Sequence, residues 1–179
     1  RQLQTHIIRS QIGHLHSSFF KLRPRARHRP LQRELRWPRP MTIRFRSLRT
    51  GREYPEEIRM ASGDMAWAKD SRTVFYPVID PETLRSFKIS RHRLGTPAER
   101  DAAGCVEKDE TFDVGIGLSR SRQYLLLSAS STLSDEYRFL DASLPTGEFR
   151  IFQQRVRGLE YSIDHLNGCF FVLTNAGAV

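Results

Sequence analysis

The segment "GLSRS" (117–121) comes closest in this sequence to a nucleophilic serine site. Serine hydrolases of the α/β type hold the nucleophile in a GxSxG turn between a strand and a helix, with an Asp and a His following in the chain. Here the closing glycine is missing and the segment lies between two expected strands. We therefore expect no catalytic residue in this chain.

The adjacent pair Asp164 and His165 is the next candidate for acid–base chemistry. Neighbouring residues of a strand point to opposite faces of the sheet. The two side chains therefore cannot form one acid–base site unaided, and we expect a structural role for both.

Two further polar runs could bind ligands, and a third is hydroxyl-rich. The triplet "RHR" (91–93) could contact an anion, but alternating basic residues on an outer strand are typical of a solvated face. The run "EKDE" (107–110) could bind a cation together with Asp113, yet Lys108 interrupts it and no glycine-punctuated calcium loop follows. We expect it to be a loop between structural units, and "SASST" (128–132) to be the exit of a strand.

The two cysteines, Cys105 and Cys169, are too few for a disulfide framework and have no neighbouring His ligand pair. We expect free thiols in a reducing compartment, which favours a cytoplasmic location. No metal or cofactor site is expected. No apolar run approaches the roughly 18 residues needed to cross a bilayer, so no membrane association is expected either.

The positive charge of the chain is confined to its beginning. Of the 179 residues, 1–40 contain ten Lys and Arg and one acidic residue, which accounts for the whole net charge of +9. The same segment is rich in Pro and His, and composition changes near Met41. Residues 1–40 are interpreted as a disordered or non-native segment, with a basic arm for polyanions and a mitochondrial-type presequence as alternatives.

From Thr42 onward, short alternating runs end at turn residues, which is typical of an all-β fold. Two features recur every ~44 to 50 residues, a spacing typical of four-stranded propeller blades. One is an alternating strand that ends in a glycine turn. The other is a strand, a polar turn and a more apolar strand. Within each repeat the second strand is expected to be covered on both faces by its neighbours. A β-sandwich is the alternative.

The repeats predict a partial β-propeller over 41–179. We expect two strands of one blade at about 42–58, full blades at 64–107 and 112–156, and the first strands of another at 160–179. A closed propeller needs four to eight blades, so the chain is expected to be a fragment. Uncovered blade faces and strand edges at its ends predict poor solubility or self-association.

Several stretches resemble consecutive parts of the propeller of the prolyl oligopeptidase family of serine peptidases, and of its oligopeptidase B branch in particular. They include "IRFRSLRTGREYPE" from residue 43, "GTPAERD" (95–101), "EKDETFDV" (107–114) and "EYSIDHLNGCFFVLTN" (160–175). Two stretches depart from the family, residues 1–40 and "AAGC" (102–105), where an apolar strand would be expected.

The resemblance implies a seven-bladed propeller that covers an α/β-hydrolase domain, admits peptides and excludes folded proteins, in an enzyme that cleaves after Arg or Lys. The hydrolase domain would be the partner, peptides the substrates, and this chain alone would be inactive. The alternative function is a non-enzymatic β-propeller or β-sheet interaction module whose basic arm binds nucleic acid or an anionic surface. Because 41–179 carry no excess charge, we expect no nucleic-acid partner.

Overall fold

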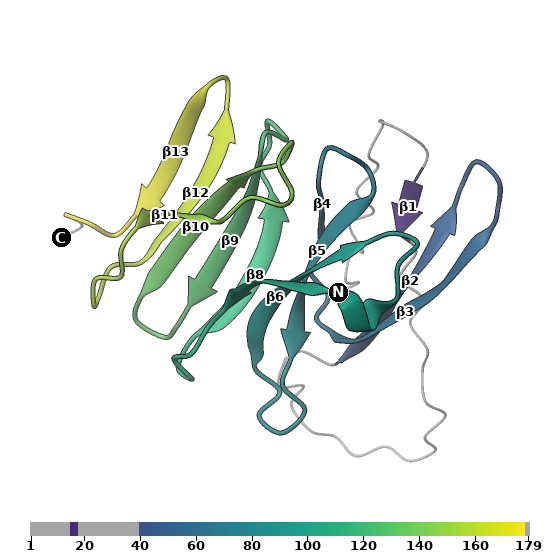
Figure 1. Cartoon of the computed structure of the whole chain (residues 1–179). Helices are drawn as coiled ribbons and strands as arrows, with labels where there is room; N and C mark the ends of the chain where they lie inside the picture. Colours follow the sequence, from purple (N-terminus) through teal and green to yellow (C-terminus); the bar gives the residue numbers. More distant parts are fainter. Residues whose placement is uncertain (1–14, 18–39, 178–179) are drawn as a thin grey trace, which may run out of the picture.

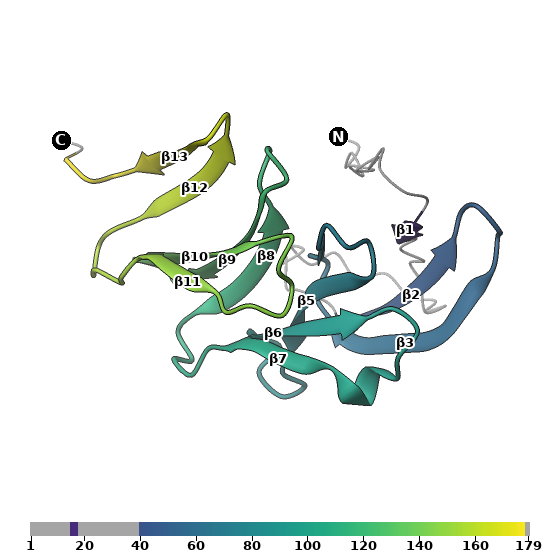
Figure 2. The same cartoon turned by 45° about the horizontal axis from the view of Figure 1, so that its top comes forward.

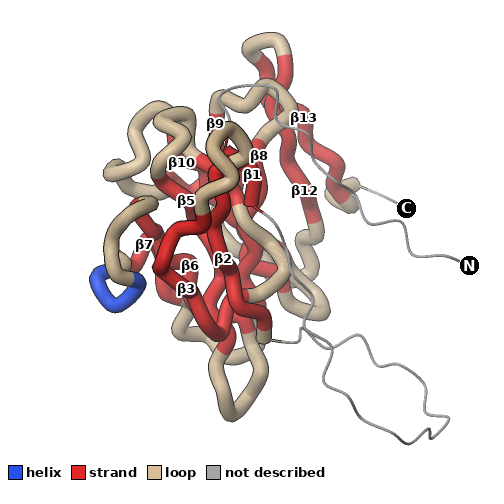
Figure 3. Tube along the Cα trace, turned by 90° about the vertical axis from the view of Figure 1, so that its right-hand side faces the viewer, coloured by secondary structure: helices blue, strands red, loops and turns tan. Residues whose placement is uncertain are grey.

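The computed structural model describes residues 15–17 and 40–177, and their regular structure is almost wholly β (Figure 1). The first sheet contains β1 (Leu15–Ser17), β2 (Met41–Ser47), β3 (Glu53–Ala61), β4 (Ala66–Trp67), β5 (Thr73–Ile79), β6 (Ser86–Arg93) and β7 (Ala102–Val106). The second contains β8 (Asp113–Leu118), β9 (Tyr124–Ser130), β10 (Asp135–Asp141) and β11 (Arg150–Gln153), and the third contains β12 (Tyr161–Leu166) and β13 (Cys169–Thr174). One short 3-10 helix, η1 (Ala98–Arg100), precedes β7 (Figure 3).

The first sheet consists of two units that are only loosely joined. β4 to β7 form an antiparallel meander of four strands, and β2 and β3 form a hairpin. The hairpin meets the meander through the single pair Ala61 and Val78, at the opposite end of β5 from β4. The described chain is thus a hairpin, two four-stranded meanders and a final hairpin, which follow one another in space as they do in sequence (Figures 1 and 2).

Apolar side chains form a separate core between each pair of successive units, as expected for propeller blades that stack on one another. Ile43, Phe45 and Ile58 lie between the β2–β3 hairpin and the β4–β7 unit. The largest core lies between the two meanders, and a third joins the β8–β11 unit to β12–β13. The core between the two meanders consists of Ala66, Ala68, Phe75, Ile89, Phe112, Val114, Ile116, Leu125, Leu127, Ala129, Leu140 and Ala142. This succession of units confirms the all-β partial propeller, not two facing sheets.

The prediction that each second strand is covered on both faces holds for two units and is wrong for the third. β5 is buried at almost every position, and β9 is buried at Leu125, Leu126 and Leu127. β13 has a similarly apolar sequence, but most of its residues are exposed. The sequence of β13 fits a covered strand, and its second face has no neighbour among the described residues.

The stretch "AAGC" (102–105) was expected to lack the apolar strand of the family, but it forms β7, paired with β6. Most of β7 is exposed, but a small residue is favoured at Gly104, where two aromatic rings approach the strand. A Cβ at Gly104 would meet the rings of Phe75 and Phe149 at 3.6 Å each. Backbone pairing with β6 therefore makes the strand, and the rings of Phe75 on β5 and Phe149 before β11 supply apolar contact at Gly104.

In four turns, the side chain of an aspartate accepts hydrogen bonds from backbone N–H groups two or three residues later in the chain. Asp70 accepts from Arg72 and Thr73 at 2.9 and 2.8 Å, and Asp80 accepts from Glu82 and Thr83 at 2.9 Å each. The other two are Asp109 in the loop before β8 and Asp141 at the end of β10. Such Asx turns form locally and need no contact with another unit.

The predicted division at residue 40 stays a prediction, because 1–14 and 18–39 lie outside the described residues.

Candidate functional site

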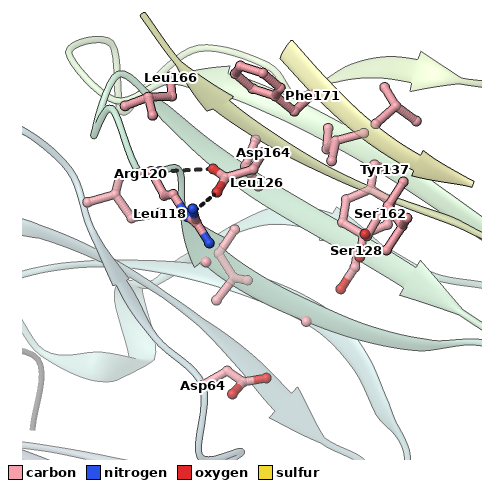
Figure 4. A pocket seen from close by; sticks show the side chains of 16 residues that line it. Asp64, Leu118, Arg120, Leu126, Ser128, Tyr137, Ser162, Asp164, Leu166 and Phe171 are labelled. Atoms are coloured by element: carbon pink, nitrogen blue, oxygen red, sulfur yellow. Dashed lines mark hydrogen bonds and ion pairs between the residues drawn. The ribbon is translucent and has the colours of Figure 1, made fainter. Parts of the chain in front are cut away.

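The first strands of the last two units are β8 and β12, and both of them line a cavity that the segment before β4 also reaches. The cavity has a volume of about 820 Å³ and lies between β8 and the β12–β13 hairpin (Figure 4). We call it the inner groove. Its lining includes Asp64, Gly115, Ile116, Gly117, Leu118, Arg120, Leu126, Ser128, Tyr137, Ser162, Ile163, Asp164, Leu166, Phe171, Val172 and Leu173.

The floor of the inner groove is bare because β8 carries two glycines on one face. A Cβ at Gly115 would lie 2.9 Å from Ser128 Oγ and 3.5 Å from Asp64 Oδ2, whereas a Cβ at Gly117 would meet nothing within 4 Å. Gly115 thus lets two polar groups approach the strand, and Gly117 leaves open space. Glycine within a strand commonly marks such a close approach of a backbone or ligand.

Asp64 brings an acidic group into the groove from the segment before β4 (Figure 4). The residue as a whole is exposed, but partial burial of its carboxyl group raises the pKa above its ordinary value. No ion pair joins its carboxylate to another residue within the described ranges. Asp64 was not predicted as a site residue from the sequence, although the glycine alternation of "DVGIGL" is recognisable there.

The second acidic group of the groove, Asp164, is paired. Its Oδ2 lies 3.0 Å from Nε of Arg120, and its Oδ1 accepts a 2.9 Å hydrogen bond from the Arg120 backbone (Figure 4). Arg120 belongs to the β8–β9 turn and Asp164 to β12. The pair therefore joins two successive units at one end of the groove.

His165 lies on the face of β12 opposite to Asp164, buried against Tyr124 and Phe170 with ring centroids 4.8 Å away in each case. Its Nδ1 lies 2.7 Å from Oγ of Ser121, and the backbone of Ser121 donates to the His165 carbonyl at 2.9 Å. Ser121 is the last serine of "GLSRS", which lies in a strand-to-strand turn. The contact fastens the β8–β9 turn to the next unit.

The interpretation of "RHR" (91–93) as a solvated face is wrong for its central residue. His92 is completely buried, and its ring stacks on Phe45 with centroids 5.3 Å apart. The reason is that β6 is an interior strand, covered by the β2–β3 hairpin. Arg91 donates to the Pro145 carbonyl at 2.7 Å, and only Arg93 is exposed.

The run "EKDE" (107–110) lies in the loop between β7 and β8, but its first residue is buried in an ion-pair cluster. Arg155, which follows β11, pairs with Glu107 and approaches Oε2 of Glu136 at 3.3 Å. Its guanidinium also lies 3.9 Å above the ring of Phe112. Burial acts to raise the pKa of Glu107, but hydrogen bonds from Arg155 and from the Asp109 backbone outweigh it, and the pKa is lowered. This cluster joins the two meanders.

The remaining sequence candidates are placed as follows. The stretch "SASST" (128–132) ends β9 and enters the next turn, with Ser128 facing the inner groove. Both cysteines are free, and Cys105 Sγ lies 3.3 Å from Nη1 of Arg138. Across 15–17 and 40–177, no three His, Cys, Asp or Glu side chains are grouped so that they could hold a metal ion. None of the described helices is long and apolar enough to cross a membrane.

Comparison with known proteins places this architecture in a family. Residues 39–179 match the family described as the prolyl oligopeptidase N-terminal β-propeller domain. The chain is 42% identical over 138 residues to the dipeptidyl aminopeptidase BI of Pseudoxanthomonas mexicana, which covers 77% of this chain and 19% of that protein. It is 30% identical over 140 residues to protease 2 of Moraxella lacunata, with 77% of this chain and 20% of that protein covered.

Solved structures show the same fold. Oligopeptidase B from Leishmania major superposes with a TM-score of 0.70 at 24% identity, covering 77% of this chain and 20% of that one. Oligopeptidase B from Trypanosoma brucei gives 0.66 at 23% identity, with 76% and 19% covered. The chain thus spans about one fifth of the length of these relatives. It belongs to the prolyl oligopeptidase family, as part of the family's N-terminal β-propeller domain.

Proposed function

We propose that residues 41–179 are part of the substrate-gating propeller of a serine endopeptidase that hydrolyses peptides after Arg or Lys. The chain itself supplies no catalytic group, and the partner is an α/β-hydrolase domain of the same peptidase. Family membership supports the enzyme class, and the curated relatives are about five times as long as the matched segment.

The position of the inner groove supports the proposed gating function. It runs beside the first strands of successive units, β8 and β12, and the segment before β4 also reaches it. In a closed propeller the first strands of the blades surround the central channel. The groove is therefore a section of the wall that a peptide would pass on its way to a hydrolase domain.

The experiment compares two substrates for the peptidase that contains this segment. One is a short fluorogenic peptide with a single Arg, and the other carries the same residues in a loop of a stable folded protein. A gate predicts rapid cleavage of the free peptide and little cleavage of the folded protein. Removal of 41–179 should abolish the discrimination.

Two controls complete the test. A peptide with Gln in place of Arg should resist cleavage, and the isolated 179-residue chain should cleave neither substrate. Equal rates on free and folded substrates would refute the gate. Cleavage after residues other than Arg and Lys would refute the specificity, and hydrolysis by the isolated chain would refute its inactivity.

We also propose a cytoplasmic location, which the two free thiols support because free cysteines are kept reduced there. Fractionation of cells with an antibody to residues 41–179 tests this. Recovery of the protein outside the cytoplasmic fraction would contradict it.

A further inference from the structure

Asp64 differs from the other carboxylates at the contacts between units. Asp101 binds His92, Glu107 binds Arg155, and Asp164 binds Arg120. The carboxylate of Asp64 has no ion pair or side-chain hydrogen bond among the described residues. It faces the inner groove beside Gly115 (Figure 4).

The strand next to Asp64 is suited to another extended backbone. β8 is the terminal strand of its sheet, so one of its edges has no partner strand within the described chain. Its face toward the groove is bare at Gly115 and Gly117, and the space at Gly117 is open. An extended peptide can add to such an edge through its main chain, while pockets for alternate side chains give specificity.

The groove lining offers both apolar and polar groups. Leu126, Ser128 and Tyr137 belong to the same sheet as β8, whereas Ser162 and Ile163 of β12 lie across from it. Arg120, the only basic residue of the lining within the described ranges, already pairs with Asp164. Charge complementarity therefore favours a ligand with a cationic group at Asp64.

We propose that the inner groove binds an extended peptide along β8, with a Lys or Arg side chain of that peptide paired to Asp64. This inference rests on the proposed gating function and adds a charge-selective subsite to the channel wall. The raised pKa of Asp64 agrees with it, because burial without a compensating cation disfavours the charged carboxylate.

The test uses the whole chain, at a concentration where light scattering shows a monomer, and fluorescence anisotropy with two labelled peptides. Both are extended, uncharged octapeptides except at one central position, which is Lys in one and the isosteric norleucine in the other. An ion pair at a partly exposed site contributes up to about 1 kcal/mol, so the Lys peptide should bind about fivefold more tightly. The preference should shrink as the salt concentration rises.

Three variants distinguish the effect of the Asp64 charge on peptide binding from the effect of the groove's shape. Asp64→Asn should reduce binding of the Lys peptide to that of the norleucine peptide. Glu110→Gln, an exposed carboxylate outside the groove, should leave the preference unchanged. Gly117→Val should weaken both peptides, because its side chain fills the open space; unchanged circular dichroism and melting temperature would show that its fold is retained.

Equal binding of the two peptides, no binding of either, or a preference that survives Asp64→Asn would each overturn the subsite. These results are separate from those that test the gate. A peptidase that still distinguishes free peptide from folded protein would retain the proposed function with the Asp64 subsite refuted. Loss of that discrimination would refute the gate, whichever peptide the chain prefers.

Discussion

Nδ1 of His92 lies 2.8 Å from Oδ1 of Asp101, and both side chains are buried. The other oxygen of Asp101 accepts a 2.8 Å hydrogen bond from the Tyr76 hydroxyl. Nε2 of His92 makes no hydrogen bond within the described residues and lies 3.8 Å from Oε1 of Glu56, which accepts a 2.7 Å hydrogen bond from the Gly95 backbone. This network fastens the β2–β3 hairpin to the β4–β7 unit, whose backbone link is a single residue pair.

Asp101→Ala should lower the free energy of unfolding by about 3 kcal/mol, because His92 and Tyr76 would both lose a buried partner. Urea denaturation followed by tryptophan fluorescence measures the change. Glu99→Ala, an exposed acidic residue of η1, is the matched control and should change it by less than about 0.5 kcal/mol. Equal effects of the two substitutions would contradict the role given to Asp101.

Arg155→Ala should also destabilise the chain, because Glu107 would remain largely buried without its paired arginine and Glu136 would keep only Arg138. Removing one partner of a buried ion pair costs about 3 to 5 kcal/mol, and partial exposure of Arg155 places the expected loss at about 2 to 3 kcal/mol. Arg157→Ala removes an exposed arginine two residues away and should have little effect. A loss as small as that of Arg157→Ala would show that the cluster is not stabilising.

Acid should weaken the contact between the two meanders. A carboxyl group whose pKa is lower in the folded than in the unfolded chain stabilises above the unfolded pKa, and this contribution is lost as the pH falls through the folded pKa. Glu107 is such a group, with an ordinary pKa of 4.5. The free energy of unfolding should therefore fall below about pH 4.5.

Urea midpoints measured at a series of pH values test this expectation. Glu107→Gln should make the acid limb shallower, because the variant has no carboxyl group to protonate at that position. Glu110→Gln should keep the slope of the unchanged chain, since this side chain is exposed and makes no ion pair among the described residues. The same acid slope in Glu107→Gln as in the unchanged chain would rule out Glu107 as its source.

The exposed face of β13 should make the isolated chain associate with itself. Phe171 and Leu173 are 57% and 77% exposed on a two-stranded sheet. Phe171→Lys combined with Leu173→Glu should shift the chain toward the monomer in light scattering coupled to size-exclusion chromatography. Leu144→Glu, in a turn where the leucine is 61% exposed, is the control. A monomer before any substitution would contradict the expectation.

The sequence predicts the propeller well because its information is local. Apolar runs such as "YLLL" (124–127), separated by polar turns at a regular spacing, need no knowledge of distant contacts. The burial of His92 was not predictable in this way, since it depends on Phe45 and on Asp101, which lie outside its own strand. Alternation of basic residues looks the same on a solvated strand and on one whose central side chain meets buried carboxylates.

The inner groove likewise combines strands that the sequence predicts with contacts between distant segments that it does not. Its two glycines stand in a recognisable strand, but the approach of Asp64 to Gly115 joins segments about fifty residues apart. The pairing of Asp164 with Arg120 has a similar separation of 44 residues. Strand periodicity shows which face a residue occupies, whereas its partner is set by how one unit is placed against the next.

The aspartates that close the turns at Asp70, Asp80, Asp109 and Asp141 have a consequence for folding order. Each turn bonds to residues two or three positions ahead, and those at Asp70, Asp80 and Asp141 join paired strands, so these three hairpins can find their register within microseconds, before distant segments meet. A nascent chain would then present preassembled hairpins to one another as synthesis proceeds. An incomplete ring can form stepwise by this route, because no early step waits for the blade that would close it.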